Sequence, residues 1–348
     1  MAWWVWAIGL ATAASFTTNP LVLLTIAGVA IVVVMARRSE QPWSASFRIY
    51  VASAVVIVVM RVVFRVVFGG GSDGGTVLVD LPEVPLPGWV LGLHLLGPVT
   101  REALLAGTYD GLRLGTIVVC VGAANALANP KRLLRSVPAA LHEVGTALVV
   151  AVTVLPQLVE SARRVRAAQA LRAGDPRRTG RLRRYLVPVL EGALDRSLSL
   201  AAGMDSRGYG RSGGAPPAER RVTGALMLVG LCGIAIGVYA GLDHTAPRVL
   251  AAPMLVVGVC AAVAGLALAG RRVGRTRYRP DPWRWPELAV IACGVATALI
   301  AWWVSQHQLL VAYPGLASFP PVTLAALVGC LIGLLPAVLA PEPRVVRA

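Results

Sequence analysis

The sequence is short of charge, and above all of lysine and acidic residues. Only 14% of the 348 residues are charged, Asp and Glu together number 17, and Lys131 is the only lysine. Soluble domains carry about a quarter charged residues, whereas 56% of this chain is hydrophobic. The composition therefore excludes an ordinary soluble domain and indicates a protein whose solvent is lipid.

Residues that carry chemistry are scarce as well. The four histidines are scattered without metal-ligand spacing, at His94, His142, His244 and His307. The five cysteines stand singly inside apolar runs, as small packing residues do. The phosphate-binding pattern Gly-x-x-x-x-Gly-Lys-[Ser/Thr] does not occur. We therefore expect no catalytic residue, no cofactor and no metal site, and any ATP must be hydrolysed by another chain.

Apolar runs of membrane-spanning length recur along the chain, and a spanning helix needs about 20 mostly apolar residues. We expect spans at Leu21–Met35, Phe47–Phe68, Leu114–Ala128, Val222–Leu242, Val249–Ala269, Glu287–Val304 and Val322–Leu339, with Trp3–Ser15 as a short eighth. The expected fold class is all-α, a polytopic α-helical membrane protein. Within the span Val222–Leu242, Gly233-x-x-x-Gly237 is either a close helix-packing site or simply glycine as a common membrane residue.

Arginines collect between the spans and give a net charge of +16. Basic clusters follow several spans, whereas residues 69–110 are mainly acidic. Basic loops face the cytoplasm, so we expect residues 130–221 and the C-terminus inside and residues 69–110 outside, in the cell inner membrane. The positive-inside rule thus accounts for the basic charge by itself. We therefore expect no nucleic-acid partner. Val144–Leu155, about 12 residues long, is too short to span comfortably and should lie shallowly.

Arg61 and Arg65 stand out in the last two turns of the span Phe47–Phe68. Long cationic side chains near a helix end can extend to the membrane interface while the stem stays in lipid. The alternative is a buried pairing with another helix. Both interpretations remain open at this point.

The arginines are densest between residues 163 and 184, which hold nine of them. Each costs about 2.5–3.5 kcal/mol at a bilayer centre, so this segment is not embedded. Helical apolar stripes flank the break at Gly174-Asp175-Pro176. The stripes are Leu155, Leu158, Val159, Ala162 and Val165, then Leu182, Tyr185, Leu186, Val189, Leu190, Ala193, Leu194, Ser197 and Ala201. The pattern predicts two long cytoplasmic helices joined by a short basic turn.

Each of these helices ends in an arginine close to a glycine. The ends are Leu171-Arg172-Ala173-Gly174 and Ser206-Arg207-Gly208. Glycine is preferred just past a helix end, and arginine there is favoured by the helix dipole. Helix capping therefore accounts for both ends as readily as a recognition motif does.

At these residues the chain resembles the T components of energy-coupling-factor (ECF) transporters, a family that includes the cobalt-transport permeases. That family carries an Ala-Arg-Gly motif at the end of each of two cytoplasmic coupling helices. Ser206-Arg207-Gly208 matches it closely, and Leu171-Arg172-Ala173 keeps the arginine. Asn19-Pro20, Thr100–Leu104 and the proline entry Val154–Leu158 resemble further family features. The similarity covers roughly residues 15–245.

The resemblance implies a function and its partners. The chain would be the transmembrane coupling subunit of an ECF-type ABC importer, transmitting ATP-driven motion from two ABC-type ATPase subunits to a membrane-embedded S-component that takes up a vitamin or a transition-metal ion. The resemblance places ATPase binding at Arg172, Ala173, Gly174, Ser206, Arg207 and Gly208. It places the S-component-facing surface at Leu158, Ala162, Val165, Leu186, Val189, Leu190, Ala193 and Leu194. The chain would divide into transmembrane segments 1–130 and 222–348 around a coupling region 131–221.

Two other classes of function each need residues that this sequence does not offer. A membrane-embedded enzyme acting on a lipid or isoprenoid is the first alternative, and it needs catalytic carboxylates or histidines near the bilayer surface. The sequence offers no acidic pair on a helix and only the four scattered histidines. A proton-coupled carrier needs acidic residues in mid-membrane, and no expected span has one at its centre. The transporter-subunit interpretation is therefore preferred.

Overall fold

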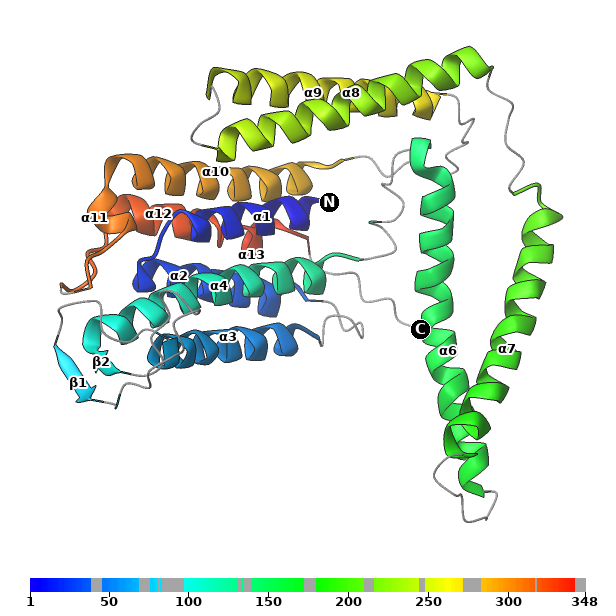
Figure 1. The fold of residues 1–348 in the computed structure, drawn as a ribbon, viewed down its shortest axis with the longest axis horizontal. Coiled ribbons are helices and arrows are strands. Elements are labelled where there is room, and N and C mark those ends of the chain that lie inside the picture. The colour runs from blue at the N-terminus through cyan, green and yellow to red at the C-terminus, as the bar shows by residue number, and fades with distance from the viewer. Residues whose placement is uncertain are drawn as a thin grey trace. The chain divides into compact units, whose positions relative to one another are not determined.

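The computed structural model in Figure 1 describes residues 1–38, 46–68, 76–80, 82, 97–129, 133, 139–171, 180–209, 216–243, 248–271, 283–316 and 318–341. Its elements are α1 (Ala2–Ser15), α2 (Pro20–Arg37), α3 (Phe47–Phe68), β1 (Val77–Asp80), β2 (Pro98–Thr100), α4 (Arg101–Leu127), η2 (Ala139–Leu141), α6 (His142–Leu171), α7 (Gly180–Asp205), α8 (Pro217–Leu242), α9 (Arg248–Arg271), α10 (Trp285–His307), α11 (Leu309–Ala312), α12 (Leu324–Ile332) and α13 (Pro336–Leu339). The expected all-α fold is confirmed, since β1 and β2 form only a short antiparallel pair.

Seven helices in the described part of the chain are long and apolar enough to cross a membrane, and six of them were expected as spans. The seventh, Glu143–Leu171, was not expected, because Val144–Leu155 alone is too short. The structure corrects this: α6 begins at His142 and continues through Pro156 without a break. The sequence analysis expected Val154–Leu158, with its proline, to be the start of a helix. These residues instead lie in the middle of α6, because the apolar run before them and the arginine-rich stripe after them belong to one continuous helix.

The chain forms two compact units. One contains residues 1–130 together with residues 281–348, and the other contains residues 131–280. The last helices therefore pack with the first ones, although about 150 residues separate them in the sequence. The division into segments 1–130, 131–221 and 222–348 is a functional one and stays a prediction.

In the first unit, α1 lies against α10 and α4, and α4 also contacts α2 and α3 (Figure 1). Its core contains the fully buried side chains of Trp6, Leu10 and Leu23. Gly9 and Gly294 let α1 and α10 meet backbone to backbone, because a Cβ on Gly294 would lie 2.5 Å from the Cα of Trp6. Such small residues allow the close approach by which helices associate in lipid.

The end of the chain holds α2 at both of its ends. At the start of α2, the buried Asn19 donates from Nδ2 to the carbonyl oxygens of Val311 (2.9 Å) and Pro321 (2.8 Å). Its Oδ1 accepts from the Leu21 backbone N–H and caps the helix. At the other end, the Arg37 guanidinium donates to carbonyl oxygens of α13. The residues after α10 are thus an integral part of this unit.

The last expected span, Val322–Leu339, is not one continuous helix. It is divided into α12 and α13 by a turn at residues 333–335. Pro336 has no backbone N–H to continue the helical ladder. The buried Trp6 indole donates to the Gly333 carbonyl at 3.0 Å and satisfies an acceptor at the break. The sequence predicted the apolar run correctly and missed the interruption.

In the second unit, α8 and α9 form a closely packed pair. A Cβ on Gly233 would lie 2.8 Å from the Cα of Gly258, and one on Gly237 would lie 2.7 Å from the backbone nitrogen of Leu255. Of the two interpretations of Gly233-x-x-x-Gly237, the structure therefore confirms the helix-packing site. The long helices α6 and α7 form a second contacting pair in this unit (Figure 1).

Candidate functional site

The end of α7 is closed by a backbone cap centred on Gly208. The Gly208 N–H donates to the Asp205 carbonyl (2.9 Å), and the Tyr209 N–H donates to the Met204 carbonyl (3.1 Å). Gly208 has a φ of +77°, a left-handed conformation that glycine adopts without steric cost. This pair of bonds is the Schellman motif. The glycine of Ser206-Arg207-Gly208 is therefore required by the way the helix ends.

Arg207 is the residue that this cap does not explain. Its backbone N–H bonds to Met204, and the Ser206 hydroxyl bonds to the Gly203 carbonyl (3.0 Å). The Arg207 side chain is exposed, and within the part of the chain that the structure describes it makes no hydrogen bond or ion pair. Capping thus accounts for Gly208, whereas the side chain of Arg207 is left exposed on a turn that backbone hydrogen bonds close.

The first arginine motif cannot be compared in the same way. Helix α6 is described as far as Leu171, whose side chain is 87% exposed. Arg172, Ala173 and Gly174 lie outside the described residues, so their predicted role stays a prediction.

The contact between α6 and α7 divides the apolar stripe of α7 into two parts. A Cβ on Gly192 of α7 would lie 4.0 Å from the Ser161 hydroxyl of α6, which locates the contact. Val189 lies three residues before Gly192 on the same helix face, and Ala193 lies one turn after Val189; both are half-buried. On α6, Leu158 and Val165 are likewise half-buried and share the face of Ser161. Four of the eight residues predicted to face an S-component are therefore half-buried on or beside the faces that meet here.

The other four predicted residues are exposed. Ala162 is exposed on α6, and Leu186, Leu190 and Leu194 on α7 are 46%, 62% and 60% exposed. The row continues to Leu198, which is 61% exposed and which the sequence analysis did not single out. Its spacing of four residues was the available signal. Leu186, Leu190, Leu194 and Leu198, called the leucine row below, form a continuous apolar ridge that is open to a partner.

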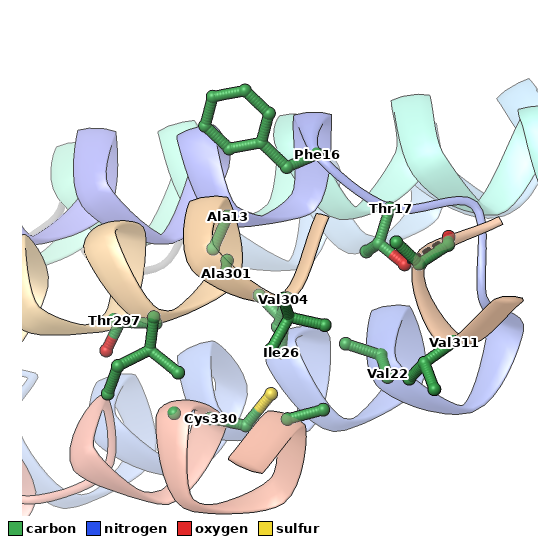
Figure 2. A pocket seen from close by; sticks show the side chains of 14 residues that line it. Ala13, Phe16, Thr17, Val22, Ile26, Thr297, Ala301, Val304, Val311 and Cys330 are labelled. Carbon is green, nitrogen blue, oxygen red and sulfur yellow. Dashed lines mark hydrogen bonds between the residues drawn. The ribbon is translucent and has the colours of Figure 1, made fainter. Parts of the chain in front are cut away.

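A small cavity of about 30 Å³ lies in the first unit among α1, α2, α10, α11 and α12 (Figure 2). Two hydroxyl groups line it, and both donate to backbone carbonyls: Thr17 to Ala312 (2.8 Å) and Thr297 to Cys293 (2.9 Å). The remaining lining is apolar, apart from the thiol of Cys330. Both hydroxyl donors of the lining are thus engaged and only the weak S–H donor of Cys330 remains, so we assign the cavity no role in binding.

The histidines and cysteines form no centre in the described part of the chain. No group of three His, Cys, Asp or Glu residues there could hold a metal ion. His307 stacks on Trp303 with ring centroids 4.8 Å apart, and its Nδ1 lies 3.0 Å from the Trp303 carbonyl oxygen. His307 is thus engaged at the end of α10. His94 and His244 lie outside the described residues.

The number and length of the apolar helices define a multi-pass α-helical membrane protein. The model of the cobalt transport protein family, CbiQ, matches residues 2–216, which is more than half of the chain, and the chain therefore belongs to this family. No curated protein and no solved structure matches the chain. Membership of this family supports a role in membrane transport.

The matched range differs somewhat from the expected similarity at residues 15–245. It begins within α1 and ends at Pro216, directly before α8. Arg207 and the leucine row lie inside the match, whereas α8 to α13 lie outside it. The residues from which the coupling function was predicted, the two arginine motifs and the helices before them, thus lie within residues 2–216, which the family model matches.

Proposed function

We propose that this chain is the transmembrane coupling (T) component of an ECF-type ABC importer in the cell inner membrane. It transmits ATP-driven motion from two ATPase subunits to an S-component that carries a vitamin or a transition-metal ion. The observation that supports this most directly is Arg207, an exposed side chain on the hydrogen-bonded turn after α7 that has no partner among the residues the structure describes. The membership of the chain in a transport family supports it as well.

The chemistry of arginine suits a docking contact at this position. A guanidinium offers a planar fork of N–H donors that can bind a carboxylate or two carbonyl oxygens at once. The Schellman turn holds the Arg207 backbone through bonds that do not use its side chain. Because the backbone there is already ordered, binding through the side chain costs little further backbone entropy. In this proposal Arg207 and Arg172 each anchor one ATPase subunit, with Ala173, Gly174, Ser206 and Gly208 beside them.

The leucine row suits the other partner. It is an exposed apolar ridge on the same helix that ends at Arg207. Exposed apolar patches of this kind mark interaction sites or membrane contacts. In this proposal the row holds the S-component, and a displacement at Arg207 reaches the S-component through the rigid body of α7. The half-buried Leu158, Val165, Val189 and Ala193 then keep α6 and α7 together.

The proposal is tested by isolating the protein from its native membrane with its partners. We expect two ATPase chains and one small membrane protein to co-purify with it. ATP hydrolysis should require the ATPase chains, and the purified single chain should neither bind nor hydrolyse ATP. An ATPase activity that remains with the single chain, or isolation without any ATPase chain in mild detergent, would contradict the proposal.

A substitution in the leucine row separates the two docking surfaces. Leu190→Glu places a carboxylate at the centre of the row, and burying an unpaired charge costs several kcal/mol. We expect the S-component to bind at least about 100-fold more weakly while the ATPases still co-purify. Ser199→Glu is the matched control, because Ser199 is exposed and half a turn round the helix from Leu190. Equal loss of the S-component in both variants would contradict a role for the row.

A further inference from the structure

Helices α6 and α7 meet along a stripe of half-buried residues on each helix. The stripe on α6 is Val154, Leu158, Ser161, Val165 and Gln169, and the stripe on α7 is Tyr185, Val189, Gly192 and Arg196. The spacing of three and four residues places each set on a single helix face. Because α6 ends at the same end of the pair at which α7 begins (Figure 1), the two stripes run antiparallel.

The contact ends at Arg196, although both faces continue beyond it. The next residues on these faces are small and exposed, and they are Ser199 and Gly203 on α7 and Ala151 and Ala147 on α6. A Cβ on Gly203 would meet nothing within 4 Å, in contrast to one on Gly192. Small side chains let helices approach each other closely. The size of the following residues therefore does not explain why the helices separate at this point.

Arg196 differs from every other residue of the two stripes, because it alone is charged. Its Nη1 atom is buried and has no hydrogen-bond partner in the described part of the chain. Since Ser161 lies opposite Gly192 in an antiparallel pair, Leu158 lies at the level of Arg196. An apolar side chain offers a guanidinium no acceptor. Closer packing at this level would therefore bury more of the guanidinium without a partner, which is unfavourable.

We propose that Arg196 fixes the point at which α6 and α7 separate. Closing the pair further would bury the guanidinium against Leu158, whereas separation lets water bond to it. The part of α7 after Arg196 is thereby left free to change its angle to α6, and this part leads to Arg207. The separation point is a property of the chain alone. Under the proposed coupling function, the segment that it releases is the one that transmits motion from Arg207.

The separation is measured by double electron–electron resonance on the purified full chain in lipid nanodiscs. Spin labels are attached through Val149→Cys on α6 and Ala201→Cys on α7, in a background in which the five native cysteines are replaced by alanine. Both positions are exposed and lie about half a turn from the contact stripes, so the labels do not enter the contact. With Arg196 in place we expect a broad distribution of distances.

Arg196→Met keeps a long side chain and removes the charge, so the helices should close past this level. We expect a narrower distribution and a shift toward the shorter distances of packed helices, whose axes lie about 8–10 Å apart. Arg163→Met is the matched control, because Arg163 is exposed and lies on the side of α6 opposite to Ser161. The control should leave the distribution unchanged.

Leu158→Glu supplies the missing acceptor while the charge of Arg196 stays in place. A carboxylate at this level can pair with the guanidinium, so the distances should again shorten. In combination with Arg196→Met, the same glutamate has no cation to pair with, and an unpaired buried charge is unfavourable. The helices of the double variant should therefore separate.

Four results would overturn the proposal. They are a narrow, short distribution in the chain that retains Arg196, no change in Arg196→Met, an equal shift in Arg163→Met, and the same effect of Leu158→Glu with and without Arg196. The measurements use the chain without ATPase subunits or an S-component. A negative result would therefore remove the role of Arg196 and leave the proposed coupling function to its own test.

Discussion

Replacing Arg207 with alanine should release or uncouple one ATPase subunit and leave the membrane fold intact. Removing one partner of a buried charged hydrogen bond costs about 2–5 kcal/mol, which corresponds to roughly 30-fold to several-thousand-fold in affinity. The fold should survive because the Schellman cap of α7 uses backbone groups and Gly208, and no described residue bonds the Arg207 side chain. Co-purification of the ATPases and the rate of uptake measure the effect.

Arg220→Ala is the matched control, because Arg220 is exposed in the first turn of α8 and solvated charges contribute little. If Arg207 served only the helix dipole, its loss would cost about 0.3–1 kcal/mol of stability with assembly unchanged. Thermal unfolding of each variant, measured beside co-purification, separates these outcomes. Equal ATPase content and equal uptake in the Arg207→Ala and Arg220→Ala proteins would show that Arg207 has no docking role.

The second large effect is expected at Asn19. Asn19→Ala removes the cap of α2, worth about 1 kcal/mol, and leaves the carbonyls of Val311 and Pro321 without their donor. An unsatisfied buried polar group costs about 1–3 kcal/mol. We therefore expect a loss of about 2–5 kcal/mol in the free energy of unfolding, seen as a lower unfolding midpoint in detergent.

Asn19→Ser separates the cap from the bridge to the chain end. Serine caps a helix about as well as asparagine, but its single hydroxyl cannot donate to both carbonyls. The serine variant should therefore lose most of the stability that the alanine variant loses. A serine variant as stable as the wild type would mean that Asn19 acts only as a cap. Thr25→Ala, which removes only a hydroxyl bonded to its own helix, should change stability little.

Most of the helices could be predicted because the signal for them is local. A run of about 20 apolar residues identifies a span wherever it packs, so α2, α3, α8, α9 and α10 were expected close to their observed positions. The end of α4 was predicted, but its start was not, because α4 begins at Arg101 and the apolar run only at Leu114. The period of the apolar stripe predicted α7 in the same way. The errors arose where local signals conflicted. Pro156 suggested a helix start inside α6, and the apolar run at α12 and α13 concealed the turn at Gly333.

The candidate site was predictable only in part. Arg207 and Gly208 were found because a helix end and a motif coincide in the sequence. The division of the apolar stripe was not predictable, because Leu190 and Val189 have the same apolar character, yet Leu190 is exposed and Val189 is half-buried. The role of Asn19 was also hidden, since its partners Val311 and Pro321 are about 300 residues away.

The sequence by itself determined that this protein lies in lipid, that it is all-α and where most of its spans are. It also determined that Arg207 stands at the end of α7. Each of these depends on neighbours within a few helical turns. Only the tertiary structure decided that residues 281–348 pack with the first helices and that the leucine row is left exposed beside the α6–α7 contact. These features depend on which surfaces meet, and packing between distant helices leaves no periodic signal in the chain.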